Sequence, residues 1–380
     1  MKVNTYKLLS IIICFSLLFT TPIYTYANTS LPDSITIQQA LDKAYKNNPD
    51  LRKASLNVEK AALSRDDAAK TVTWIPEGGL VIPAYQQVMN NYQQAEIGYQ
   101  VAKKAEETAR DSITYTVVNA YCDALTNYNT MELNRLRLED AKIQLTMNSV
   151  ARAVGTLAEF DYEKAKAGTE QLEKAYELAK AQYNSSIAAL RSLLGESENW
   201  QPELISKPIL TQYNRRDLNT EISRGLSESI DVWNKEAQLK NQENQQSWVI
   251  PGLSSEMQNI NLEMAKVDYE KSKRDTRTSI EQLYYLLDTM EGQIATAQQA
   301  YETASRDWQI AELKYELGMI AQSALSSIKT AELNARINLD NAKVAIAQIK
   351  AQYALLTGQE PYNPADWTDI EAPVANANEK

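Results

Sequence analysis

Residues 158–195 read AEFDYEKAKAGTEQLEKAYELAKAQYNSSIAALRSLLG, and residues 321–358 read AQSALSSIKTAELNARINLDNAKVAIAQIKAQYALLTG. In both stretches, apolar or small side chains recur at alternating steps of four and three, which is the heptad pattern of packed helices. The pattern begins at Ala158 in the first stretch and at Ala321, 163 residues later, in the second. Only Glu332 interrupts it. The chain therefore contains the same helical unit twice.

Glycines flank each stretch. The two pairs, each 40 residues apart, are Gly155 with Gly195 and Gly318 with Gly358. Glycine suits the left-handed residue that commonly follows the last turn of a helix. Before the first pair, residues 85–152 contain no proline, which predicts a helix of up to 68 residues, roughly 100 Å long. The sequence thus predicts an all-α fold of two long antiparallel helical hairpins per chain, with coiled-coil packing and little or no β-structure.

Shorter helices precede the long helix. Thr36 and Gln39 form a capping box, so a helix should begin there. Asn48 then offers an N-cap before Pro49, which starts a second helix because proline is tolerated at the first helical position. In the second half, the corresponding predicted helices cover residues 217–227, 230–246 and 254–317.

These patterns divide the chain into five segments. The predicted divisions are a signal peptide (1–27), a first helical-hairpin repeat (28–195), a linker (196–216), a second helical-hairpin repeat (217–358) and a flexible tail (359–380). The tail is expected to be loose because it contains three prolines at the end of the chain.

The first residues are typical of an exported protein. Lys2 and Lys7 precede an apolar run over 8–19, and small residues at Thr25 and Ala27 match a signal-peptidase site. Cys14 lacks the preceding small residue that lipoprotein processing needs. Cleavage after Ala27 removes two lysines and no acids, so the formal charge changes from −10 to −12. An acidic mature chain argues against nucleic acid as a partner.

Composition excludes most catalytic sites. The chain has no histidine, and Cys122 is the one cysteine beyond the leader, so zinc sites, Ser-His-Asp triads and Cys-His dyads cannot be assembled. Acidic residues are mixed with lysines along the predicted helices, which is typical of solvated faces. The sequence therefore predicts no enzyme and no catalytic, cofactor-binding or metal-binding residues.

The long helix of the first repeat has apolar side chains on more than one face. Val117 and Tyr121 lie on one face, beside Val118 and Cys122 on the next. Both faces need partners: one is the returning helix, and the other is the second repeat, another protomer, or both. A closed ring of hairpins would cover every such face.

In order along the chain, several short motifs resemble the TolC family of outer-membrane efflux proteins. They are IQQAL (37–41) followed by NNPDL (47–51), YELG (315–318), AELNAR (331–336) and YALLTG (353–358). The resemblance implies a homotrimer with a helical tunnel below an outer-membrane β-barrel. It also implies a location in the cell envelope, and a periplasmic adaptor and an inner-membrane pump or secretion transporter as partners.

One departure from the family concerns the barrel. Family members insert two membrane strands per repeat, and each strand needs about 9 to 11 residues of alternating character. The first insertion site, residues 72–84, contains two prolines and two glycines, and the second, residues 248–253, is only six residues long. We therefore expect an abbreviated relative that lacks most of the barrel strands, so contact with an outer membrane is left open. In a cell without such a membrane, the chain would lie at the extracytoplasmic surface.

The resemblance also suggests functional residues. The hairpin tips, where family members meet their adaptors, correspond to Gly155, Thr156, Leu157, Gly318, Met319 and Ile320; the alternative is that these are ordinary tight turns. The tunnel aperture would contain Asp161, Ser326 and Ser327. The simpler interpretation of Asp161, which we favour, is an acid that stabilises a helix N-terminus.

Two functions are consistent with these observations. The first is a trimeric duct for efflux or secretion, opened and closed by twisting helices at the hairpin tips. The second is a non-conducting extracytoplasmic coiled-coil scaffold of the same ancestry that has lost the barrel. The short insertions favour the scaffold, whereas the retention of both hairpin tips favours the duct.

Overall fold

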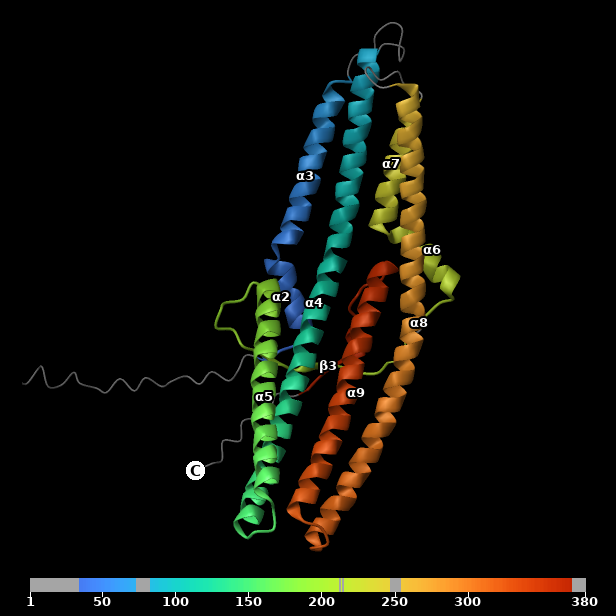
Figure 1. The fold of residues 1–380 in the computed structure, drawn as a ribbon. Helices are drawn as coiled ribbons and strands as arrows, with labels where there is room; N and C mark the ends of the chain where they lie inside the picture. The colour runs from blue at the N-terminus through green and yellow to red at the C-terminus, as the bar shows by residue number, and fades with distance from the viewer. Residues whose placement is uncertain (1–33, 73–82, 212, 214, 247–253, 371–380) are drawn as a thin grey trace, which may run out of the picture. The chain divides into compact units, whose positions relative to one another are not determined.

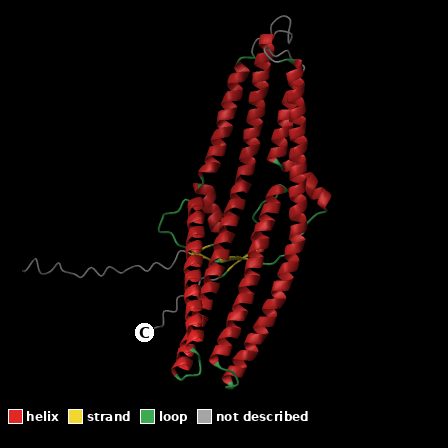
Figure 2. Cartoon of the chain, in the orientation of Figure 1, coloured by secondary structure: helices red, strands yellow, loops and turns green. Residues whose placement is uncertain are grey.

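The computed structural model describes residues 34–72, 83–211, 213, 215–246 and 254–370. Helices dominate these residues, and the strands among them are only two or three residues long (Figures 1 and 2). The predicted all-α class with little β-structure is confirmed. The predicted turns at 72–84 and 248–253 lie almost entirely outside the described residues.

Among the described residues, the first half contains four helices. Their bounds are α2 (Ile37–Asn47), α3 (Pro49–Lys70), α4 (Pro83–Ala153) and α5 (Glu159–Leu194). The Thr36–Gln39 capping box is present, with Gln39 N donating to Thr36 Oγ1 at 3.1 Å and Thr36 N donating to Gln39 Oε1 at 3.0 Å. Asn48 accepts from Asp50 N at 2.7 Å. The local sequence therefore sets both helix starts as expected.

The second half has the same order of two shorter helices, one long helix and one returning helix. The bounds are α6 (Leu218–Glu228), α7 (Ile230–Gln246), α8 (Ser255–Glu316) and α9 (Gln322–Leu356). Asp217 and Ser254 cap α6 and α8 by accepting from backbone N–H groups three residues ahead. The long helix predicted over 254–317 therefore has Ser254 as its N-cap.

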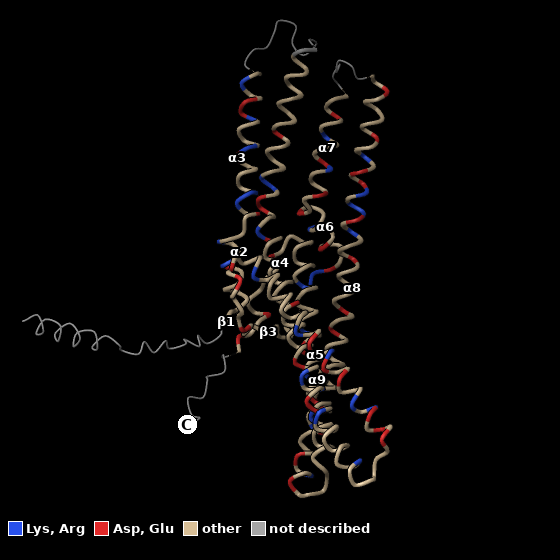
Figure 3. Tube along the Cα trace, turned by 60° about the vertical axis from the view of Figure 1, so that its left-hand side comes forward, with Lys and Arg blue, Asp and Glu red and all other residues tan. Residues whose placement is uncertain are grey.

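The long helices pack as neighbours in a defined order. α4 contacts α5, α9 contacts α8, and α4 also contacts α9, so the order is α5, α4, α9, α8. Towards the other end of α4 and α8, α3 lies beside α4 and α7 lies beside α8 (Figure 1). Acidic and basic residues are interspersed along these helices (Figure 3). The two inner helices, α4 and α9, thus have neighbours on both sides.

Short strands join the linker to both ends of the described chain. β1 (Ser34–Ile35) pairs in parallel with β2 (Glu203–Leu204), and β3 (Ser206–Pro208) pairs antiparallel with β4 (Trp367–Asp369). Between them, Ile205 donates to Ile35 O at 3.2 Å and accepts from Ile370 N at 2.9 Å. The segment predicted as a plain linker therefore contacts the start of the first repeat and the segment predicted as a tail.

The expected flexible tail is wrong for residues 359–370. This segment contains a 3-10 turn over Pro364–Asp366 and then β4. The Trp367 ring meets Tyr121 edge to face at 5.9 Å, and Tyr362 is buried. Aromatic burial and strand pairing thus outweigh the conformational effect of the prolines. Residues 371–380 lie outside the described ranges.

Two apolar clusters hold the helices together. The first joins α2, α4, α5 and part of α9 around Tyr121, whose hydroxyl donates to Ile35 O at 3.1 Å and accepts from Ser206 N at 3.0 Å. Cys122 is fully buried in this cluster, and burial raises the pKa of its thiol. The second cluster joins α6, α8 and α9 around Ile280, Leu287 and Tyr353. α9 contributes to both clusters.

The heptad positions face these clusters. On α5, every position of the pattern from Tyr162 to Leu193 is buried or half-buried, and the same is true of α9 from Leu325 to Leu356. Only the first positions, Ala158 and Ala321, are exposed, because they lie at the hairpin tips. The coiled-coil packing expected from the sequence is therefore confirmed.

Leu287→Ala tests the second cluster. Leu287 is fully buried, and a buried Leu-to-Ala change costs about 2–5 kcal/mol of unfolding free energy because it leaves a cavity. Urea denaturation of the purified chain measures the loss. Leu286→Ala is the matched control: its side chain is 39% exposed, so we expect a cost below about 1 kcal/mol. Equal costs at the two positions would contradict this packing.

Candidate functional site

Both hairpin tips have the same backbone geometry. Gly155 and Gly318 have φ of +77° and +70°. After Gly155, Thr156 N donates to Ala151 O at 2.9 Å, and after Gly318, Met319 N donates to Lys314 O at 2.8 Å. These 6→1 bonds define Schellman motifs, which satisfy carbonyls left free at the helix end. Nothing lies within 4 Å of a Cβ built on either glycine, so the positive φ alone requires glycine.

The tip surfaces are apolar and exposed. Of the predicted tip residues, Gly155, Thr156, Gly318 and Met319 are exposed, whereas Leu157 and Ile320 are half-buried. Other exposed apolar side chains nearby are Val154, Phe160, Leu313 and Leu317, with Phe160 77% and Leu317 75% exposed. The sequence reasoning did not select these side chains, although their place beside the turn glycines was visible. Together they form an apolar surface at each tip.

The first tip has a polar contact that connects its two helices. Arg152 at the end of α4 bonds Glu159 at 2.9 Å, and its guanidinium lies 3.9 Å from the Tyr162 ring centre. Asp161 is exposed in the first turn of α5, close to the free N–H groups of that helix. This position matches the favoured interpretation of Asp161 as an acid that stabilises the helix dipole.

The predicted aperture residues occupy different helices. Asp161 lies in α5, Ser326 and Ser327 lie in α9, and α4 contacts both helices. Ser326 Oγ donates to Asp140 Oδ1 of α4 at 2.5 Å, whereas Ser327 is exposed. Within one chain, therefore, Ser326 connects the two hairpins.

The Ser326 contact is one of several polar contacts along the seam between α4 and α9. Gln348 donates to Asp123 at 2.8 Å, Asn129 to Asn341 at 2.8 Å and Arg137 to Asn334 at 3.3 Å. On α9 the amide residues at 348, 341 and 334 are seven apart, so they lie along one face. The heptad spacing of these amides was the signal in the sequence that could have predicted a polar seam.

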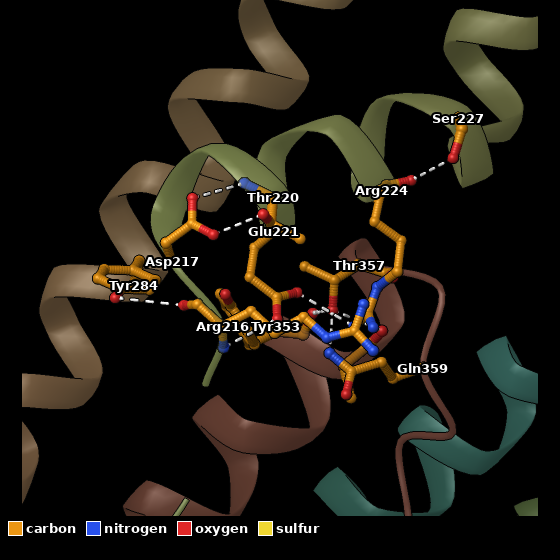
Figure 4. A network of polar contacts seen from close by, with 11 residues as sticks. Arg216, Asp217, Thr220, Glu221, Arg224, Ser227, Tyr284, Tyr353, Thr357 and Gln359 are labelled. Atoms are coloured by element: carbon orange, nitrogen blue, oxygen red, sulfur yellow. Dashed lines mark hydrogen bonds and ion pairs between the residues drawn. The ribbon is translucent and has the colours of Figure 1, made fainter. Parts of the chain in front are cut away.

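A second polar network fixes α6 against α8 and α9 (Figure 4). Glu221 is 3% exposed and pairs with Arg224 at 3.1 Å, while its other oxygen accepts from Arg216 N at 3.3 Å. Arg224 Nε donates to Thr357 O at 2.7 Å, at the end of α9. Tyr284 on α8 donates to Arg216 O at 3.4 Å. The buried charges compensate each other, so the network connects helices.

Lys350 makes a similar buried contact near the tail. Only 6% exposed, its Nζ donates to Thr211 O at 3.1 Å and to Asp366 Oδ1 at 3.4 Å. Thr211 also hydrogen-bonds Asp366. A buried lysine needs such compensation because isolated buried charge is costly. The contact joins α9, the linker and the segment before β4.

The described residues contain neither a cluster of metal-binding side chains nor a candidate membrane span. Within these residues, no three carboxylate, histidine or cysteine side chains converge to hold a metal ion. The described helices are also too polar, over any stretch of membrane length, to qualify as membrane spans.

Similar solved structures are outer-membrane channels, although sequence comparison finds no protein-family model and no curated protein that matches this chain. CmeC of Campylobacter jejuni aligns with a TM-score of 0.60 and 16% identity over 86% of this chain and 87% of CmeC. MtrE of Neisseria gonorrhoeae, in its open state, aligns with a TM-score of 0.62 and 15% identity over 86% of this chain and 89% of MtrE. The outer membrane protein VceC of Vibrio cholerae aligns with a TM-score of 0.60 and 14% identity over 86% of this chain and 97% of VceC. The chain therefore has a TolC-like fold.

Glycine-to-alanine changes at Gly318 and Gly292 should have opposite signs. Both glycines are free of neighbours within 4 Å, but Gly318 has φ of +70° whereas Gly292 lies inside α8. Gly318→Ala should lower the unfolding free energy by about 1–2 kcal/mol because a Cβ is strained there. Gly292→Ala should raise it by about 0.5–1 kcal/mol. Denaturation curves measure both, and a stabilising Gly318→Ala would contradict the tip geometry.

Proposed function

We propose that this chain is one protomer of a TolC-like duct. Three exported copies, each delivered by the leader over residues 1–27, would form a ring of hairpins around a water-filled path for efflux or secretion. The duct would catalyse no reaction. The fold shared with outer-membrane channels supports the proposal. The observation that carries it is the pair of exposed apolar stripes on the outer helices of the chain.

The α8 edge stripe consists of Met257, Ile260, Met264 and Val267. Each of these side chains is about half exposed or more, with Met264 at 64%. Their steps of three, four and three residues give the heptad pattern of a helix that packs on another helix. In the described chain, this stripe has no helix over it, because the neighbours of α8 cover its other side.

The opposite edge has a matching stripe on α3. Leu56 and Leu63 are seven residues apart and 51% and 61% exposed, and no side chain of α3 is fully buried. Burying a large aliphatic side chain contributes about 1.5–3 kcal/mol. Packing α3 of one protomer against α8 of the next would bury both stripes and close the ring, with every helix between two neighbours.

The exposed apolar tips suit a helical-hairpin adaptor. Gly155, Thr156 and Leu157 in the first tip, and Gly318, Met319 and Ile320 in the second, would contact it through knobs-into-holes packing. An inner-membrane pump or secretion transporter would complete the assembly.

Opening at the tips would separate α4 from α9 near Ser326. Groups that lose a hydrogen bond along that seam can bond water instead, at a net cost of only about 0.5–1.5 kcal/mol each. Apolar side chains in the seams within each hairpin have no such replacement when they are exposed. Each hairpin would therefore move as a unit. In the ring, Asp161, Ser326 and Ser327 would lie near the aperture.

The alternative is a non-conducting envelope scaffold with the same fold. The observation in its favour is the brevity of the segments at 72–84 and 248–253. A scaffold would still use the hairpin tips and edges for contacts but would enclose no path.

Met264→Glu tests lateral closure. A carboxylate in a buried helix–helix seam is unfavourable. We therefore expect the protein concentration at which half of the trimer dissociates to rise at least about tenfold. Light scattering after size-exclusion chromatography reads the mass. Lys266→Glu is the control, because two residues along a helix is a rotation of about 200°. A trimer unaffected by Met264→Glu, or equally affected by both changes, would argue against this seam.

Electron microscopy of the purified mature protein separates the duct from the scaffold. The duct predicts end-on views with three-fold symmetry and a central hole. Side views would be at least as long as α4, roughly 105 Å at 1.5 Å per residue for its 71 residues. Solid rods, or single hairpin pairs without a hole, would support the scaffold instead.

A further inference from the structure

A groove of about 370 Å³ lies between α4 and α7, away from the tips and the α4–α9 seam. Its apolar lining comes from Tyr92 and Ile97 on α4 and from Trp233 and Ala237 on α7. The lining residues of α4 (92, 93, 96, 97 and 100) and of α7 (233, 236, 237, 240 and 244) recur at steps of three and four, so each helix contributes one face. The volume is at the lower end of the range usual for small-molecule sites, about 300–1,000 Å³.

Polar contacts bridge α4 to the second half of the chain on either side of this lining. Before Tyr92, Gln245 Nε2 of α7 donates to Asn90 Oδ1 of α4 at 3.1 Å, and both residues are buried. Beyond the lining, Lys104 of α4 pairs with Glu228, the last residue of α6, at 3.0 Å. The groove therefore lies between two cross-links and has a limited length along α4.

The charged side chains of the groove are mostly acidic. Glu96 of α4 and Glu236 of α7 line it, against one base, Lys240. Lys240 bonds Glu236 at 2.6 Å but is 66% exposed. Glu96 accepts from the neutral Gln100 amide at 2.8 Å, and Arg65 of α3 approaches it only to 3.9 Å. Exposed ion pairs of this kind contribute about 0–1 kcal/mol, so a ligand cation can compete for both carboxylates.

One polar atom of the lining also lacks a partner. The side-chain oxygen of Gln93 is buried and accepts no hydrogen bond from the described residues. An unsatisfied buried acceptor costs about 1–3 kcal/mol, which a donor would recover. The lining thus contains two aromatic rings, two carboxylates and one acceptor that has no partner among the described residues.

We propose that this groove binds a small amphipathic cation, with an aromatic body and a protonated amine. The body would lie against Tyr92 and Trp233, whose faces also attract cations. The ammonium would donate to Glu96 and Glu236 in charge-assisted hydrogen bonds. The site is independent of conduction, so it holds for the duct and the scaffold alike.

Three probes of one shape test the charge preference. They are 1-naphthylmethylammonium, 1-naphthylmethanol and 1-naphthylacetate, titrated against the purified full chain by naphthyl fluorescence and equilibrium dialysis. Hydrogen bonds to charged groups are worth about 1.5–3 kcal/mol, so the cation should bind at least about tenfold more tightly than the alcohol. The anion should bind most weakly. Equal binding of all three, preference for the anion, or no binding of the cation would overturn the proposal.

Variants place the binding in this groove. Glu96→Gln and Glu236→Gln should each weaken the cation about three- to tenfold and leave the alcohol unchanged, because they remove charge without changing shape. Glu243→Gln is the matched control on the exposed surface of α7, outside the lining. Trp233→Leu should weaken cation and alcohol together by about tenfold, since both rest on the ring. Equal effects of all three Glu→Gln changes, or no effect of Trp233→Leu, would refute the site.

Discussion

Each long helix of this chain has more apolar surface than one neighbouring helix can cover. α9 shows the constraint most clearly: Leu339, Ile346 and Tyr353 enter the cluster with α8, while Val344 and Ala351 enter the cluster with α4. An antiparallel hairpin alone would leave one of these faces in water. The side-by-side order of α5, α4, α9 and α8 covers the apolar faces of the inner helices on both sides and leaves one face of each outer helix without a neighbouring helix. The exposed stripes on α3 and α8 follow from the same constraint.

Polar contacts are distributed unevenly among the helix seams. Within each hairpin, the seam follows the apolar heptads, whereas the seam between the hairpins near the tips also carries hydrogen bonds among amides, a guanidinium, a carboxylate and a hydroxyl. The buried pairs Glu221–Arg224 and Lys350–Asp366 fix α6 and the tail segment to α9. Removing one partner from such a pair is costly, so these contacts set position more than they add stability. The boundary between the hairpins is thus apolar beside Val344 and Ala351 and more polar towards the tips.

Much of the fold was predictable because its signals are local or periodic. The Thr36 cap, the Asn48-Pro49 start and the heptad positions depend on neighbours within one or two turns, and all appear as expected. The order of the docked tail was not predictable, because Trp367 is stabilised by Tyr121, far away in sequence. For the same reason, Ser326 was assigned to an aperture and not to Asp140. The groove between α4 and α7 depends on how two helices diverge, which no periodicity records.

The strand pairing around Ile205 has a consequence for how the chain is made. β1 cannot find its partner until residues 203 and 204 have emerged, and β3 waits for residues 367–369. A protein that crosses a membrane from its N-terminus would therefore hold its first strand open while the whole first hairpin forms. The pairing of β3 with β4 comes last and requires that both halves of the chain have been made. A truncated copy lacking β4 would leave β3 as an unpaired edge, free to pair with a strand of another chain.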